Sequence, residues 1–124
     1  MRISTELSLA ALLSTVALTS AAHHSMPALF DTGSTVTVSG EVTGFQFISP
    51  HAYILMDVVD GTGERVNWQI ETYPPGMLIR KGLTPANVQP GQTISATGHP
   101  SRDGRPLMRL LTVTMPNGDE KQIQ

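Results

Sequence analysis

From residue 35 onward, apolar and polar residues alternate in short runs separated by glycine, proline and aspartate. Val36, Val38 and Val42 alternate with polar neighbours. The apolar phase then shifts by one position to Phe45 and Phe47, beside a glycine. A one-residue shift of this kind is typical of a β-bulge, which allows a strand to curl. The pattern therefore predicts a long and strongly bent first strand.

Two further strands follow, joined by a tight turn. Residues 52–59 are apolar on both faces, which is typical of a central strand. The sequence Asp-Gly-Thr-Gly at 60–63 predicts the turn, because glycine tolerates the backbone angles that turns require. Residues 65–71 predict the third strand, since Val66, Trp68 and Ile70 alternate with polar residues.

A short helical insertion is expected next, because two prolines and a glycine at 74–76 end the third strand. Residues 77–81 predict about one helical turn, stopped by Gly82. Thr84 followed by Pro85 is a helix-start signal and predicts a second short turn that ends near residue 88.

Two more strands complete the predicted fold, at residues 92–98 and 106–115. A turn at 116–118 could close a hairpin to a short polar tail. The order is three strands, a helical insertion and two strands. Together with a bent first strand, this order predicts an all-β, OB-like five-stranded barrel over residues 35–124, with the insertion between strands three and four. Another small barrel or sandwich is the alternative.

Residues 1–22 have the pattern of a secretory signal peptide. Arg2 provides a positive start, residues 7–18 are mostly apolar and uncharged, and residues 20–22 are small. The apolar run is shorter than the roughly 20 residues that a spanning helix needs. We therefore expect a periplasmic or secreted bacterial protein whose mature chain has no transmembrane span and begins with a histidine-containing segment at 23–34. A short N-terminal helix or a retained anchor is the alternative.

Composition restricts the chemistry available to this chain. It has no cysteine, which excludes disulfides, thiolate metal ligands and a cysteine nucleophile. Its formal net charge of -2 argues against nucleic acid as a partner. No nucleophile elbow or carboxylate pair stands out, so we expect a protein that is not an enzyme. Any metal site must use histidine, methionine or carboxylate side chains.

The four histidines fall at three places along the chain that suit a metal site. His23 and His24 stand at the expected mature N-terminus. His51 and His99 each neighbour a proline, which predicts that both lie in loops at an end of the barrel.

Cleavage after Ala22 would make His23 the first residue. Its amine and imidazole could then chelate copper, and a second imidazole would complete a T-shaped site, the histidine brace. Cleavage after Ala21 would place His24 third, an arrangement that favours square-planar Cu(II) or Ni(II). His51 is the best candidate for an additional ligand, ahead of Met26 and His99. Alternatively, the terminal histidines are simply solvated.

Two other groups of residues have both a functional and a structural interpretation. Glu71 and Tyr73, at the end of the third strand, could form a site or a solvated strand end. Trp68, Phe45 and Phe47 could form a stacking platform, but their alternation with apolar residues favours core packing.

An ordered set of motifs supports a family resemblance: Ala-His-His-Ser at 22–25, Phe-Asp at 30–31, Gly-x-Val at 40–42, Ser-Pro-His-Ala at 49–52 and the tryptophan strand. Over about residues 21–118 the chain resembles small exported bacterial proteins that form a domain-of-unknown-function family. Ser49 stands where the family usually has asparagine, and Tyr53 where tryptophan is common. The resemblance implies no activity, but it implies that His23, His24 and His51 belong together.

These observations lead to one main functional hypothesis. We expect an exported, non-enzymatic protein that binds copper through His23, His24 and His51. The alternative is an OB-like binding module for a peptide, glycan or partner protein without metal, which an exposed apolar patch around Phe45, Phe47 and Tyr53 would favour. A small copper oxidase is a third hypothesis.

Overall fold

The computed structural model describes residues 25–124. The predicted signal peptide and the candidate ligands His23 and His24 lie outside the described residues. The elements in chain order are α1 (Met26–Leu29), β1 (Val36–Gln46), β2 (Tyr53–Val59), β3 (Arg65–Glu71), α2 (Pro75–Arg80), β4 (Thr93–Pro100), β5 (Leu107–Thr114) and β6 (Glu120–Gln122).

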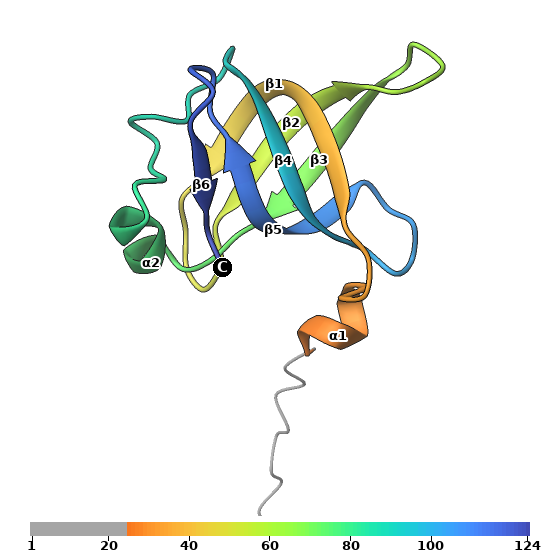
Figure 1. Cartoon of the computed structure of the whole chain (residues 1–124), viewed down its shortest axis with the longest axis horizontal. Helices are drawn as coiled ribbons and strands as arrows, with labels where there is room; N and C mark the ends of the chain where they lie inside the picture. The colour runs from red at the N-terminus through yellow and green to blue at the C-terminus, as the bar shows by residue number, and fades with distance from the viewer. Residues whose placement is uncertain (1–24) are drawn as a thin grey trace, which may run out of the picture.

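The strands form a closed barrel, as the sequence predicts (Figure 1). Their order in the sheet is β3-β2-β1-β4-β5-β6, and an additional parallel pairing of β3 with β5 closes the first five strands into a ring. The closing seam is short, because it pairs only Gln69, Ile70 and Glu71 with Leu107, Met108 and Arg109. The predicted all-β, OB-like barrel with a short helix between strands three and four is confirmed.

Strand β1 is long and bent, and it pairs with two neighbours. Its first half pairs with β4 and its second half with β2, with a register shift between Val42 and Gly44. The predicted β-bulge is therefore confirmed. At the changeover, a Cβ atom on Gly40 would overlap the backbone carbonyl of Asp57. Glycine allows the close approach of β1 and β2 at this point.

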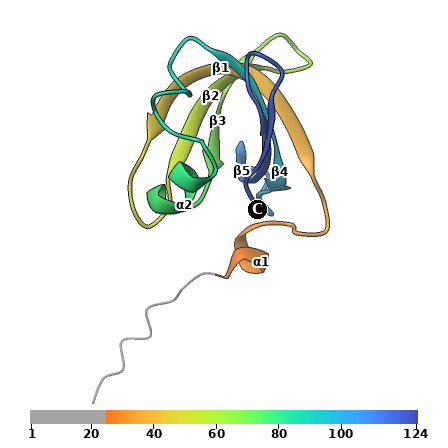
Figure 2. The same ribbon diagram turned by 60° about the vertical axis from the view of Figure 1, so that its left-hand side comes forward.

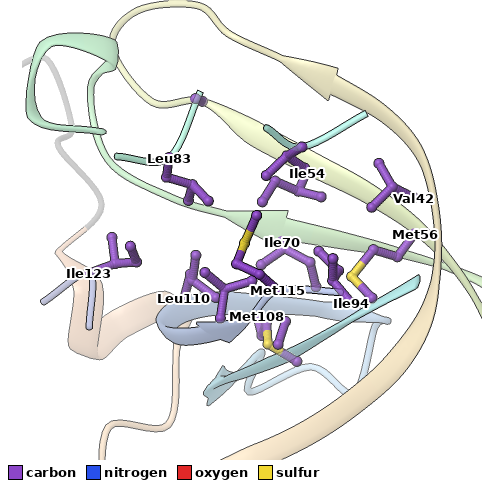
Figure 3. Packing of buried hydrophobic residues seen from close by; sticks show 14 of the residues in the cluster. Val42, Ile54, Met56, Ile70, Leu83, Ile94, Met108, Leu110, Met115 and Ile123 are labelled. Carbon is purple, nitrogen blue, oxygen red and sulfur yellow. The ribbon is translucent and has the colours of Figure 1, made fainter. Parts of the chain in front are cut away.

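The barrel interior is filled by alternate strand residues (Figure 3). Ile54 and Met56 of β2, Ile70 of β3 and Leu110 of β5 are fully buried. Because side chains alternate along a strand, their immediate neighbours point away from this core. Residues after β3 and at the C-terminus cover the barrel end and are also fully buried: Leu78, Leu83, Val88 and Ile123.

The insertion between β3 and β4 contains one helix rather than two helical turns. Helix α2 begins at Pro75, two residues before the predicted start. The second predicted helical turn, near Thr84, is instead a single hydrogen-bonded turn in which the N–H groups of Asn87 and Val88 donate to the Thr84 carbonyl (3.1 and 3.0 Å). The segment is too short to add further helical bonds, and the Asn87 carboxamide oxygen accepts from the Thr84 N–H instead.

Strand β4 extends past its predicted end and includes His99 and Pro100. The prediction that His99 lies in a loop is therefore wrong. His99 pairs with Arg109 of β5, and Pro100 is the last residue of the strand. Proline has no N–H, but this position needs only a hydrogen-bond acceptor. The Pro100 carbonyl accepts a hydrogen bond from the Asp31 N–H (2.9 Å), so proline is tolerated there.

The hairpin expected at 116–118 is present, and its second arm is a strand. This strand is β6, which pairs with the end of β5. Ile123 follows this strand and is fully buried. No helix among residues 25–124 is long and apolar enough to cross a membrane.

Candidate functional site

Five polar or aromatic side chains gather where β2 begins and β3 ends. We call them the Glu71 cluster: His51, Tyr53, Glu71, Tyr73 and Arg109. The sheet register creates its centre, because Tyr53 pairs with Glu71 on β3 and Glu71 pairs with Arg109 on β5. Tyr53, Glu71 and Arg109 alternate with buried core residues of their strands, so these three side chains lie on the outer face of the barrel.

Glu71 and Arg109 form a buried ion pair. Arg109 Nη1 donates to Glu71 Oε1 at 2.8 Å, and only 5% and 11% of the Arg109 and Glu71 side chains are exposed. The Arg109 guanidinium lies 4.1 Å from the centre of the Tyr73 ring, which adds a cation–π contact. Its Nε atom is buried and has no partner within the described structure. The ion pair and the cation–π contact hold the guanidinium against the carboxylate.

His51 contacts the same carboxylate oxygen from the β1–β2 loop. Its Nδ1 lies 2.9 Å from Glu71 Oε1, and 41% of its side chain is exposed. Because an ionised carboxylate only accepts hydrogen bonds, Nδ1 must carry a proton. In the neutral ring, Nε2 then has a free lone pair. His51 therefore has an oriented ring and one nitrogen available to a ligand.

Tyr53 binds the other carboxylate oxygen. Its hydroxyl donates to Glu71 Oε2 at 3.4 Å. Burial, with the nearby Glu71 charge as the second cause, raises the pKa of the Tyr53 hydroxyl above its usual 10.0. The Tyr53 hydroxyl therefore keeps its proton and remains a neutral donor at neutral pH.

Backbone contacts fix the end of the loop that carries His51. The Ala52 N–H donates to the Tyr73 carbonyl at 3.2 Å, and the Ala52 carbonyl accepts from the Thr72 N–H and hydroxyl at 2.8 and 2.9 Å. Thr72 is fully buried. The residue after His51 is thus tied to the residues that follow Glu71. In both ribbon views, this loop lies beside α2 (Figures 1 and 2).

His99 makes a separate interaction. Its Nδ1 lies 2.8 Å from the Ser34 carbonyl oxygen, so this ring is also oriented by a backbone group. Among residues 25–124, no group of three histidine or acidic side chains is arranged to hold a metal ion. The described chain therefore supplies His51 with an adjacent carboxylate, and further ligands would have to come from elsewhere.

The segment that leads towards His24 is anchored to the β4–β5 turn. Phe30 is buried and forms a bridge with Ser101. Arg102 holds α1 by donating from Nε to the Pro27 carbonyl at 2.7 Å and from its N–H to the Leu29 carbonyl at 3.0 Å. Helix α1 and the β1–β2 loop lie at the same end of the barrel (Figures 1 and 2).

Two cavities lie away from the Glu71 cluster. One of about 330 Å³ is lined by Asn87, Gln92 and residues around the β5–β6 hairpin, including Lys121. Another of about 110 Å³ lies between β3 and the start of β5, beside Asn67 and Arg105. Neither is lined by a residue of the cluster.

The structure also decides between the two interpretations of several residues. Phe45, Phe47 and Trp68 are partly buried against the core, which confirms the packing interpretation. Glu71 is buried rather than a solvated strand end. Arg109 is not among the residues predicted from the sequence, although a lone arginine within the apolar strand at 107–113 is a signal of a buried charge.

Comparison with known proteins places the chain in a family. A profile described as "Family of unknown function (DUF6152)" matches residues 10–108. The chain belongs to this family. The DUF6152 match confirms that the protein is a member of a family of unknown function, as its motifs suggest. A search of curated proteins finds no match.

Similar solved structures match the chain at 16% sequence identity. A complex of TiaS with a transfer RNA and ATP matches 65% of this chain and 18% of that one, with a TM-score of 0.48. A "ZRD-deleted mutant of TiaS in complex with agmatine" matches 73% and 24%, at 0.46. The structure of "yeast Stn1 and Ten1" matches 65% and 42%, at 0.43. The DUF6152 chain thus spans less than half the length of each of these proteins.

Proposed function

We propose that this protein is exported and binds copper, and that His51 joins the N-terminal histidines His23 and His24 as a ligand. The observation that carries the proposal is the His51–Glu71 contact of 2.9 Å. Metal-ligating histidines commonly donate their second ring nitrogen to a carboxylate, which orients the ring and raises its basicity. His51 has this arrangement, with Nε2 free for a metal.

The chain length is compatible with a joint site. Phe30 bridges to Ser101, the Ser101 N–H bonds to the Leu107 carbonyl, and Leu107 pairs with Gln69. Three strand spacings therefore separate Phe30 from Gln69, or about 14 Å. Helix α1 spans about 6 Å, and each residue before it can add up to about 3.5 Å. Glu71, which contacts His51, lies two strand residues beyond Gln69, or about 7 Å further along β3. The reach of an amine at His23 is of the same order as the resulting distance.

The donor set favours copper over other metals. A chain without cysteine has no thiolate ligand, and the candidate ligands here are imidazoles and a terminal amine. Nitrogen donors of this kind in a tetragonal arrangement suit Cu(II) or Ni(II), and copper is the tighter binder of the two. The proposed role is copper binding without catalysis.

A metal-free binding module has less support. Its expected apolar patch needs Phe45 and Phe47 to be exposed, whereas both pack partly against the core and against each other at 5.3 Å between ring centres. Ile48 is more exposed, but it is a single side chain in a loop.

The test uses protein processed from its own leader in a bacterial host. Intact mass measured under native conditions identifies the first residue and any retained metal. Cu(II) titration then compares the wild type with His51→Ala and with His99→Ala as the matched control, because His99 is oriented only by a backbone carbonyl.

We expect His51→Ala to weaken Cu(II) binding at least about tenfold and to change the electron paramagnetic resonance spectrum. The His99→Ala protein should bind copper as the wild type does. An unchanged affinity and spectrum in His51→Ala would remove His51 from the site. A wild type that binds Cu(II) no better than a short peptide with its N-terminal sequence would contradict the proposal as a whole.

A further inference from the structure

The larger cavity, of about 330 Å³, lies between the segment that joins α2 to β4 and the β5–β6 hairpin. Asn87 and Gln92 line it on the first side, and Asp119 and Lys121 line it on the second. Its volume falls at the lower end of the range of small-molecule sites, about 300–1,000 Å³. We propose that this cavity binds a small apolar α-amino acid, whose carboxylate contacts Lys121 and whose ammonium contacts Asp119. This inference is independent of the proposed metal site.

Lys121 points into the cavity although it lies on an edge strand. It pairs with Val113 of β5, which is fully buried, so the two side chains share the inner face of the hairpin. The Lys121 Nζ reaches the turn after α2, where a Cβ atom added to Gly82 would lie 3.3 Å from it. Within residues 25–124, the Lys121 ammonium forms no ion pair with a carboxylate. A partly buried ammonium without an anionic partner favours a ligand that carries one.

Asp119 supplies the opposite charge, two residues before Lys121. Residues two apart on an extended chain share a face, and their Cα atoms lie about 7 Å apart. The Asp119 N–H donates to Asn117 Oδ1 and its Oδ2 accepts from Asn117 Nδ2, both at 2.9 Å. The second carboxylate oxygen, Oδ1, has no hydrogen-bond partner in the part of the chain that the structure describes. The cavity therefore offers a separated positive and negative group, which is the arrangement that a zwitterion matches.

The remaining lining is fixed in position and partly apolar. The carboxamide oxygen and nitrogen of Asn87 both bond to backbone groups of its own segment. The Gln92 carbonyl accepts from a backbone N–H of β1 at 2.8 Å, which ties this wall to the barrel. Met115, which is 8% exposed, and Pro116 supply apolar surface. An aliphatic side chain on the amino acid would cover this surface, so leucine is a suitable probe.

An inward-pointing charge on an edge strand can also discourage pairing with other chains. This second role needs the Lys121 ammonium, but it needs neither Asp119 nor a ligand. Binding measurements in which each charge is removed in turn therefore distinguish the two roles.

The experiment titrates the full processed protein with L-leucine and with two analogues that each lack one charge. Isocaproate lacks the ammonium group, and isopentylamine lacks the carboxylate. Backbone amide shifts in ¹⁵N–¹H spectra measure the affinity and locate the bound molecule. The test variants are Lys121→Met and Asp119→Asn. Glu120→Gln is the matched control, because Glu120 lies between them on the opposite face of the strand and is exposed.

Leucine should bind the wild type at least about tenfold more tightly than either analogue, since a hydrogen bond to a charged group contributes on this scale. Lys121→Met should weaken leucine and isocaproate about tenfold and leave isopentylamine unchanged. Asp119→Asn should weaken leucine and isopentylamine to a similar extent and leave isocaproate unchanged. The Glu120→Gln protein should bind leucine as the wild type does.

The proposal would be overturned if leucine bound the wild type no better than isocaproate, or if its spectral changes lay away from the cavity lining. A wild type that binds no leucine, together with a Lys121→Met protein that self-associates, would leave Lys121 with edge protection alone. The comparison of the three ligands in the wild type needs no substitution, so it decides the question even if a variant does not fold.

Discussion

Removing the Glu71 carboxylate should be among the most destabilising single changes on the outer face of the barrel. Glu71→Ala leaves the Arg109 guanidinium, which is 5% exposed, without a charged partner in the described structure. Breaking a buried ion pair from one side costs about 3–5 kcal/mol, because the remaining charge stays out of water. A domain of this size is stable by about 5–15 kcal/mol, so the variant should fold but unfold at much lower urea concentration.

The size of this effect can be separated from simple loss of packing by a double-mutant cycle. Arg109→Met removes the other charge, and the double variant Glu71→Ala/Arg109→Met should recover most of the loss, since no buried charge remains. Asp57→Ala is the control: its partner Arg65 is 66% exposed, so the loss should be about 1 kcal/mol or less.

Urea unfolding followed by tryptophan fluorescence provides the free energies. The reasoning would be refuted by a Glu71→Ala cost as small as that of the Asp57→Ala control. It would equally be refuted if the double variant lost the sum of the two single effects, because the two charges would then be energetically independent.

Three other side-chain environments lead to smaller tests. Gly98→Ala should lower the free energy of unfolding by about 1–3 kcal/mol, because the added Cβ would overlap a backbone oxygen of β5. The control Gly61→Ala adds a Cβ in open space and should change the free energy of unfolding by less than about 0.5 kcal/mol. Thermal denaturation measures both. Hydrogen bonds from a serine hydroxyl and a glycine N–H, aided by Arg102, hold the pKa of Asp31 below 3.8. The ionised Asp31 carboxylate therefore stabilises the fold above pH 3.8, and this stabilisation is lost as the pH falls through the lowered pKa. Amide exchange around this turn should show this acid dependence in the wild type and lose it in Asp31→Asn. Burial, followed by the Glu71 charge, places the pKa of Tyr53 above 10.0. Ultraviolet titration should therefore show a midpoint above 10.0, and this midpoint should fall in Glu71→Gln. The free energy that the protonated Tyr53 hydroxyl contributes to folding should be lost only as the pH rises through that midpoint.

Much of the fold could be predicted because its signals are local. Alternating apolar residues located the strands, and the third strand at 65–71 was predicted with its observed bounds. The phase shift beside Gly44 indicated the bulge, since a slip of one residue reverses the face of every later side chain. The insertion was located by prolines and glycines, whose backbone restrictions do not depend on distant residues.

The remaining features depend on contacts between distant parts of the chain. Pro100 is compatible with a strand end only because the N-terminal segment pairs with its carbonyl, which no local pattern reveals. The environment of Glu71 depends on Arg109, which lies 38 residues later in the sequence. Periodicity could identify a polar residue at a strand end, but only the parallel β3–β5 pairing determines that this residue is buried.

The seam that closes the barrel and the proposed metal site share the same residues. At adjacent register positions, Ile70 and Met108 join β3 to β5 inside the barrel, and Glu71 and Arg109 join them outside. The ion pair therefore contributes both to barrel closure and to the orientation of His51. These two roles predict different responses to Glu71→Gln: the amide can still accept from Arg109 and limit the loss of stability, but it removes the charge that orients and polarises the imidazole. A Glu71→Gln protein that folds well yet binds copper poorly would show that the carboxylate is needed for the site beyond its part in closing the barrel.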